Sequence, residues 1–295
     1  MKKIPFIILL TLLIVLVGCE NDRISTETGS TSTILEKLEF NQAVGVYSTN
    51  IEPSGSSVSS FFLFGLASNL KKESFDTLNN SDISITLSNE KKDEIKFTPE
   101  EIKWELTDPS LLKGGFFIHL TSDRIVGFEK LVLDKIKFDV NKNSITKNIN
   151  PVYLQFYSGE QNGVSVMESP LAPKNEVALQ KEYTYSYKIL DSNHIITSAV
   201  KAELIYPEDI KNYIEIVDIE VNHDKNTEEQ LKEEYKGKVD EKKLKGIQVY
   251  EIKCTYIIRK KGNIVFQPAI KIIFKNKEQI LAPSEPVSFF NFSTT

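Results

Sequence analysis

Cysteine and histidine are the side chains best able to act as nucleophiles, proton carriers or metal ligands. This 295-residue sequence contains two cysteines and three histidines. A thiolate is a nucleophile and a metal ligand, and an imidazole exchanges protons or binds metals near neutral pH. None of the five residues lies at metal-ligand spacing from another, and the usual zinc, calcium, phosphate-loop and serine-nucleophile motifs do not occur. The sequence therefore predicts no catalytic residue, no metal site and no cofactor. The five residues are Cys19, Cys254, His119, His194 and His223.

Two kinds of site form only in space and leave no local motif. A metal site would need His194 and His223 to meet in the folded chain, and a glycan hydrolase would need two acidic side chains in one cleft. His119 lies in the alternating run 116–120, where a hydrogen-bonded structural histidine is expected. Neither kind of site is predicted here.

The first cysteine ends an apolar N-terminal segment. Residues 4–17 are almost entirely apolar and follow the basic pair Lys2-Lys3. This segment is shorter than the about 20 residues that span a bilayer, and its pattern is typical of a secretory signal peptide. Its end, Leu16-Val17-Gly18-Cys19, resembles the lipobox of bacterial lipoproteins.

The lipobox resemblance implies that a diacylglyceryl group joins the Cys19 sulfur and that cleavage falls between Gly18 and Cys19. Residues 1–18 are then a lipoprotein signal peptide. The alternatives are a plain membrane anchor or a cleaved signal peptide with an incidental cysteine. Because two or more acyl chains hold a protein stably, we expect a lipid anchor on the extracytoplasmic face of a cell membrane. The Lys-, Asn- and Ile-rich composition resembles that of low-GC Gram-positive bacteria.

Composition narrows the class of the mature chain. Removal of residues 1–18 takes away Lys2 and Lys3, so the formal net charge moves from −5 to −7. An acidic chain of this kind does not suit nucleic-acid binding. Without Cys19 only Cys254 remains, so no internal disulfide can form, and its alternating surroundings predict a buried, unreactive thiol. Residues 19–32 are polar and lack an apolar repeat, which indicates a disordered tether.

Beyond the tether, alternating apolar and polar residues predict an all-β chain of antiparallel sheets. Branched and aromatic residues fill these runs, and Gly, Asn and Pro separate them. The predicted strands are 83–87, 116–120, 131–140, 152–157, 183–190, 199–206, 213–221, 247–259, 269–274 and 287–292.

Two segments of the chain look alike at an offset of 135 residues. Gly127 matches Gly262, and Pro151-Val152 matches Pro286-Val287, whereas the strand before Asn141 is out of phase by one residue. The repeat predicts two tandem immunoglobulin-like β-sandwich domains, 33–160 and 165–295. The cysteine pair and the repeated central tryptophan of true immunoglobulin domains are absent, so the fold name is an analogy.

Helix is expected mainly as a short charged insertion near 226–246 in the second domain. Thr227 is placed to cap a helix that Gly237 ends. The run 228–246 mixes both charge signs and reads as a solvated protrusion or, alternatively, a partner-binding appendage. The segment 57–70 fits either a helix or a buried strand, and its centre, 60–65, fits either core or an exposed contact patch.

The composite prediction is a lipid-anchored, extracytoplasmic binding protein that is not an enzyme. Its expected partners are the membrane, through the N-terminal lipid, and a protein at the cell surface. The alternatives are a solute-capture lipoprotein of a transporter, a wall or glycan hydrolase, and an immunity or assembly-factor lipoprotein. The ligand and the oligomeric state do not follow from the sequence.

The anchoring prediction has a direct test. Cys19→Ala removes the sulfur that carries the lipid, so the protein should move from the membrane fraction to a soluble or uncleaved form. Cell fractionation and the mass of the N-terminal peptide measure this. A variant that stays in the membrane with normal processing would contradict the lipobox assignment.

Overall fold

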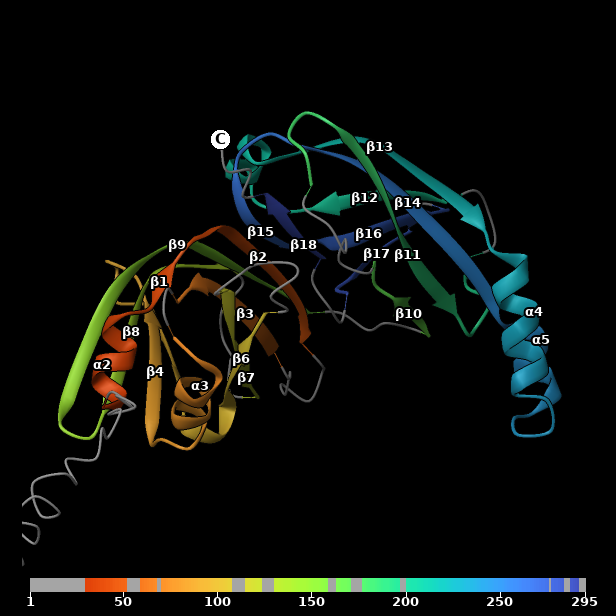
Figure 1. Cartoon of the computed structure of the whole chain (residues 1–295). Coiled ribbons are helices and arrows are strands. Elements are labelled where there is room, and N and C mark those ends of the chain that lie inside the picture. The colour runs from red at the N-terminus through yellow and green to blue at the C-terminus, as the bar shows by residue number, and fades with distance from the viewer. Residues whose placement is uncertain are drawn as a thin grey trace, which may run out of the picture.

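The computed structural model describes residues 30–51, 59–67, 70–107, 115–123, 130–158, 163–170, 177–196, 200–275, 277–283 and 287–291. The expected signal peptide, Gly18, Cys19 and the tether up to residue 29 lie outside the described residues. Within them the chain is mostly β-strand with a few short helices, as the alternation predicted (Figure 1). The strands form two β-sandwiches that lie side by side.

The first sandwich has the strand order of an immunoglobulin-like domain. One of its sheets has the order β1-β3-β7-β6 and the other includes β2-β9-β8-β4-β5. The strands of the first sheet are β1 (Glu39–Phe40), β3 (Ser59–Leu66), β7 (Gly115–Ser122) and β6 (Ile102–Leu106). Those of the second are β2 (Gln42–Ile51), β9 (Asn143–Ser158), β8 (Lys130–Val140), β4 (Ile83–Ser88) and β5 (Glu94–Phe97).

The second sandwich repeats this order. One sheet runs β10-β11-β14-β13, and a three-stranded sheet, β12-β16-β17, faces it. The strands are β10 (Val164–Glu168), β11 (Glu182–Asp191), β14 (Gln248–Ile258), β13 (Ile214–His223), β12 (Lys201–Ile205), β16 (Ala269–Phe274) and β17 (Lys277–Leu281). The immunoglobulin-like sandwich therefore rests on strand order in both halves, without the disulfide that the sequence lacks.

The two sandwiches share a sheet. Strands β15 (Gly262–Gln267) and β18 (Val287–Asn291) of the second half extend the β2 sheet into a seven-stranded one of order β18-β15-β2-β9-β8-β4-β5. Strand β2 lies between β9 and β15 and pairs with both in parallel, with Val46 opposite Tyr153 on one side and Phe266 on the other. The expectation of antiparallel sheets holds for the other strand pairs of the described residues, whereas these two pairs, which join strands far apart in the sequence, are parallel.

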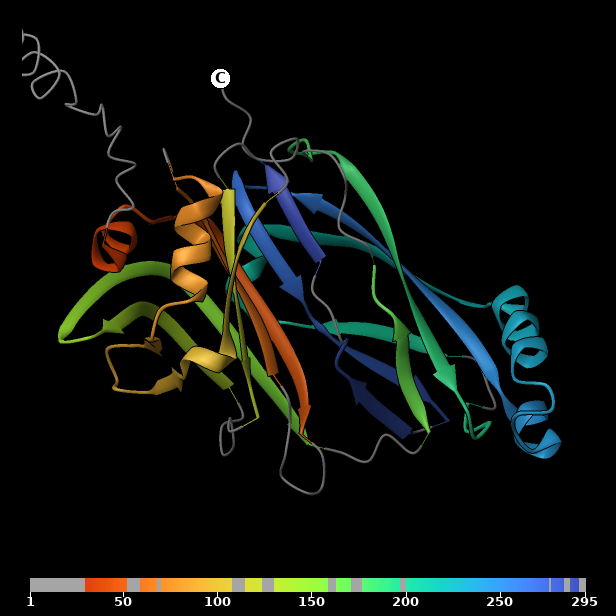
Figure 2. The same ribbon diagram turned by 60° about the horizontal axis from the view of Figure 1, so that its bottom comes forward.

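The shared sheet separates two hydrophobic cores. Tyr47 of β2 belongs to the first core, whereas its neighbours Val44 and Val46 belong to the second. Strand β15 also contributes to both cores, with Val265 in the first core and Phe266 in the second. Tyr153 of β9 also lies in the second core; the remaining buried residues of the first core fall within 34–156 and those of the second within 164–289. Strands β2 and β15 therefore each contribute to both cores, so the two sandwiches form one body (Figure 2).

Two helices cover the first sandwich where the sequence predicted none. Helix α2 (Thr31–Glu36) begins inside the stretch expected to be tether. Helix α3 (Lys72–Asn79) buries Phe75 and Leu78, and the Asn79 side chain both accepts from Trp104 N and donates to Trp104 O, each at 2.9 Å. The two-residue apolar stripe of α3 was too short to signal a helix. The ambiguous segment 57–70 holds strand β3, whose Phe61 and Leu63 are buried.

The segments that repeat at an offset of 135 residues occupy equivalent places. In the first half β8 and β9 form one long hairpin with an irregularity between Leu133 and Lys135. In the second half the corresponding hairpin is broken, so that β16 pairs with β17 in one sheet while β15 pairs with β18 in the shared sheet. The break follows Gln267, where Pro268 has no N–H to offer a ladder.

Sharing of β2 predicts that the two cores unfold together. Val46→Ala removes two methyl groups from the second core, which should lower the free energy of unfolding by about 1–3 kcal/mol. Trp104, the single tryptophan, is buried in the first core and reports on it. We expect the denaturation midpoints from tryptophan fluorescence and from far-ultraviolet circular dichroism to shift together.

The exposed residue Val217 on β13 provides the control, because Val217→Ala should leave both midpoints in place. An unchanged fluorescence midpoint in Val46→Ala would contradict the coupling of the two cores.

Candidate functional site

Three connections of the second sandwich gather at one end of it. Strand β11 ends at Asp191 opposite Gln248, and β13 ends at His223 opposite Tyr250, so the turn after β11 and the β13–β14 connection share this end. Strand β12 starts there too, since Lys201 lies opposite Ile273 next to the β16–β17 turn. We call this the loop end. In immunoglobulin-like sandwiches the equivalent connections are common carriers of binding residues.

A helical hairpin replaces a simple turn between β13 and β14. Helix α4 (Lys225–Glu234) is followed by α5 (Glu241–Gly246), and the two project from the loop end, on the far side of the molecule from α2 (Figure 1). The charged insertion near 226–246 thus lies in these helices and their link. The expected cap Thr227 is wrong, because the N-cap of α4 is Asp224, whose carboxylate accepts from Thr227 N at 3.0 Å. Gly237, with φ of +74°, turns the chain between the helices.

A polar cluster fixes α4 to the strands beneath it. Glu228 accepts hydrogen bonds from Lys232, one turn along the helix, and pairs with Nε2 of His223 at 2.6 Å. The His223 ring stacks on Tyr250, with ring centroids 5.5 Å apart. Although burial opposes ionisation of Glu228, hydrogen bonds from Lys232 and His223 lower the pKa of its carboxyl below 4.5. Glu228 is therefore a carboxylate near neutral pH and acts as the hub of the cluster.

Lys188 of β11 completes this base. Its Nζ donates to Thr227 Oγ1 at 3.1 Å and forms ion pairs with Asp224 and with Glu168 of β10. Hydrogen bonds from the Thr227 side chain and backbone lower the pKa of the Asp224 carboxyl. The base thus connects α4 to all four strands of the sheet β10-β11-β14-β13, which holds the direction of the hairpin.

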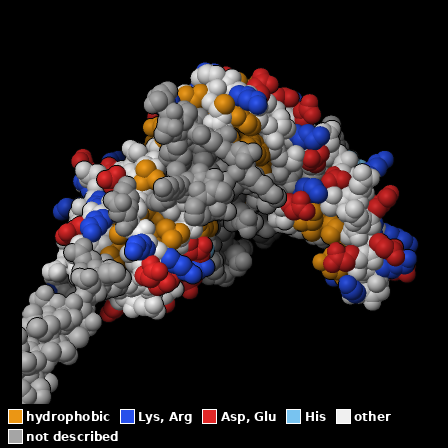
Figure 3. Space-filling model, in the orientation of Figure 1, with side chains coloured by type: hydrophobic (Ala, Val, Ile, Leu, Met, Phe, Trp, Pro, Cys, Tyr) orange, Lys and Arg blue, Asp and Glu red, His pale blue; other side chains and the backbone are white. Residues whose placement is uncertain are grey.

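The tip of the hairpin, residues 235–239, is the most exposed apolar part of the loop end. The large hydrophobic side chains that stand exposed among the described residues are Val217, Tyr235 and Val239, at 47%, 40% and 39%. Two of these belong to the tip. Lys238 lies over the Tyr235 ring at 5.9 Å, and Lys236 pairs with Glu233. Figure 3 shows basic, acidic and hydrophobic side chains close together at the end of the molecule from which the hairpin projects.

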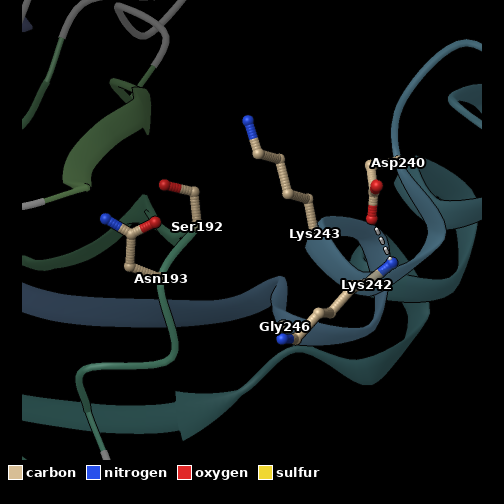
Figure 4. Close-up of a pocket in the computed structure, with 6 residues that line it drawn as sticks. All are labelled: Ser192, Asn193, Asp240, Lys242, Lys243 and Gly246. Carbon is tan, nitrogen blue, oxygen red and sulfur yellow. Dashed lines mark hydrogen bonds between the residues drawn. The ribbon is translucent and has the colours of Figure 1, made fainter.

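A pocket of about 360 Å³ lies between the turn after β11 and helix α5. Figure 4 shows open space between the side chains of Ser192 and Asn193 on one side and that of Lys243 on the other. Asp240 caps α5 by accepting from Lys242 N at 2.8 Å. The lining residues are Ser192, Asn193, Asp240, Lys242, Lys243 and Gly246. Sequence reasoning missed this pocket because its two walls are separated by almost fifty positions.

The histidines do not form a common site. His119 stacks on Phe62 with centroids 4.5 Å apart, and burial lowers the pKa of its ring. His194 is exposed in the turn after β11, and His223 belongs to the base of α4. In the described part of the chain, no group of three or more His, Cys, Asp or Glu side chains is arranged to hold a metal ion.

Cys254 is fully buried, as its alternating surroundings predicted. Burial raises the pKa of its thiol to about 12. The neighbouring hydroxyls of Tyr187 and Tyr256 lie 3.3 Å apart in the same core. The thiol is therefore a protonated core group near neutral pH rather than a nucleophile.

No described helix is long and apolar enough to cross a membrane.

No protein-family model and no curated protein matches the chain. Among solved structures it is similar to a marsupial T cell receptor, with 11% identity and a TM-score of 0.23. The alignment covers 84% of this chain and 61% of that one, so the chain spans less than two thirds of its length. A score this low carries no argument, and the fold assignment rests on strand order alone.

The base of α4 predicts a pH dependence. A carboxyl with a lowered pKa stabilises the fold above its ordinary range, and this contribution is lost as the pH falls through the lowered value. We therefore expect α4 to open on acidification below about pH 4.5, the ordinary glutamate value. Glu228→Gln should remove this part of the pH dependence and reduce amide protection of α4 at neutral pH, measured by hydrogen exchange.

Glu229→Gln, at the exposed neighbouring position, is the matched control and should behave like the parent chain. The same pH profile in both variants would show that Glu228 does not govern the base.

Proposed function

We propose that this protein is a lipid-anchored, extracytoplasmic binding protein that presents its helical hairpin to a protein partner at the cell surface. The observation that carries the proposal is the hairpin itself. It projects from the loop end of the second sandwich, opposite the side where the chain enters at α2 (Figure 1). With a lipid at Cys19, the hairpin would be the part of the body held farthest from the anchor.

The tip has the chemistry of a protein contact. Protein interfaces are enriched in aromatic side chains, and a few such anchors supply most of the binding free energy. Tyr235 and Val239 stand exposed at the tip, whereas most large apolar side chains of the described chain are buried or half-buried. Lys236 and Lys238 are adjacent in sequence to these residues, and Lys238 lies over the Tyr235 ring, which gives the tip a polar rim.

The carboxyl groups with a shifted pKa differ from the general acid of a glycan hydrolase. A hydrolase needs a carboxylic acid whose pKa is raised so that it can act as the general acid. In the described residues the shifted carboxyl groups are Asp139, Asp224 and Glu228, and all three are lowered by hydrogen bonds that outweigh burial. The helices of the described residues are short and few, which does not suit the α/β architecture of most solute-capture proteins.

Photo-crosslinking tests this function in cells. A photoreactive side chain at position 235 should yield one dominant protein adduct in the membrane fraction, and one at position 217, equally exposed on β13, should not. Tyr235→Ala with Val239→Ser should weaken binding of the captured partner by about 30-fold, the loss typical of an interface hot spot. Equal adducts from both positions, or unchanged affinity of the double variant, would contradict the proposal.

A further inference from the structure

The pocket beside α5 carries uncompensated positive charge. Residues 236–245 contain five lysines against Asp240 and Glu241, in a chain whose formal net charge is −5. Most ion pairs of the loop end lie at the base of α4, where Lys188 and Lys232 meet carboxylates. Lys242 and Lys243 line the pocket and form no ion pair with any described residue. The single carboxylate of the pocket, Asp240, is engaged as the cap of α5.

The remaining wall supplies neutral polar groups. Ser192 Oγ donates to Gly163 O at 2.9 Å, which fixes the hydroxyl at the pocket mouth. Asn193 N donates to the buried Asp191 at 3.2 Å, and Ile196 N donates to the same carboxylate at 2.7 Å. The Asp191 carboxylate therefore holds the turn in place. The Asn193 side chain lies across the opening from the lysines (Figure 4). Because the Ser192 hydroxyl proton is already donated to Gly163 O, the lysines are the hydrogen-bond donors that the pocket offers to a ligand.

The chemistry of the walls selects the ligand. Two ammonium groups offer hydrogen-bond donors and point charges, which suit an oxyanion rich in acceptors. Lysine is a common binder of phosphate oxygens, and the pocket volume falls at the lower end of the range for small-ligand sites. We propose that the pocket between the β11 turn and α5 binds a phosphoryl group, with Lys242 and Lys243 as its charge partners and Ser192 and Asn193 as its polar wall.

This site is independent of the proposed function, because the tip residues Tyr235 and Val239 do not line the pocket. The group could be a free phosphate ester or the headgroup of an anionic lipid or polymer. Each of these ligands presents the same phosphoryl oxygens to the lysines, and they differ only in the molecule that carries the group. Anion binding is measured on the isolated chain without a protein partner, so its failure leaves the proposed function untouched.

The test is a titration of the full-length chain in neutral detergent with inorganic phosphate and with glycerol phosphate, followed by backbone NMR shifts of residues 192–193 and 242–246. We expect saturable shifts confined to these residues, and an affinity loss of about tenfold or more in Lys242→Ala/Lys243→Ala. Lys71→Ala/Lys72→Ala, an adjacent exposed pair in the first sandwich, is the matched control and should bind like the parent.

Flotation with phosphatidylglycerol and phosphatidylcholine vesicles then separates the sources. Lysine-dependent flotation only with the anionic vesicles assigns a lipid headgroup, and phosphate binding without flotation assigns a soluble ester. Three outcomes would overturn the proposal: no saturable shifts with either probe, equal binding by the Lys242/Lys243 variant, or an equal response to an acidic peptide. The last would mean that the lysines recognise negative charge on a protein rather than a phosphoryl group.

Discussion

The parallel pairing of β2 with β15 is the interaction on which the arrangement of this molecule depends. Without β15, strand β2 would end the sheet of the first sandwich and expose a row of unpaired backbone groups. With it, β2 becomes an inner strand whose alternate side chains enter different cores, so that Tyr47 stabilises one sandwich and Val46 the other. This register is strongly fixed, because a shift of the pairing by one residue would turn every side chain of the strand to the wrong face of the sheet.

A shared sheet also controls where the loop end points. Two domains joined by a linker alone move relative to each other by default. Here the ladder through β9, β2 and β15 removes that freedom, and the pairing of His223 with Glu228 fixes α4 to β13. The exposed tip and the lysine-lined pocket are therefore presented in one orientation relative to the side where the chain enters. If the hairpin binds a partner as proposed, this fixed orientation avoids an entropic cost on association.

Local sequence patterns predicted much of the secondary structure, but they could not predict which distant segments lie side by side. The alternation of 131–140 and 247–259 identified β8 and β14, since one face of each strand is buried. The charged insertion was equally visible, because Gly237 and the acidic run mark a helix and its end. The β2–β15 pair was not, since parallel partners far apart in sequence leave no common signal. The pocket between Ser192 and Lys243 was missed for the same reason, and α3 because only Phe75 and Leu78 reach the core.

The pairing of β2 with β15 constrains the order of events during synthesis and folding. Chains are made from the N-terminus, so β2 exists long before its partner β15, which follows after most of the remaining sequence. During this interval the outer edge of β2 is open to any other extended segment, including the same strand of a neighbouring chain. Closing the sheet joins residues of very high sequence separation, a slow step in folding. The segment that begins at Gly262 thus completes the sheet of the first sandwich, and a product truncated before Gly262 would keep the outer edge of β2 open to aggregation.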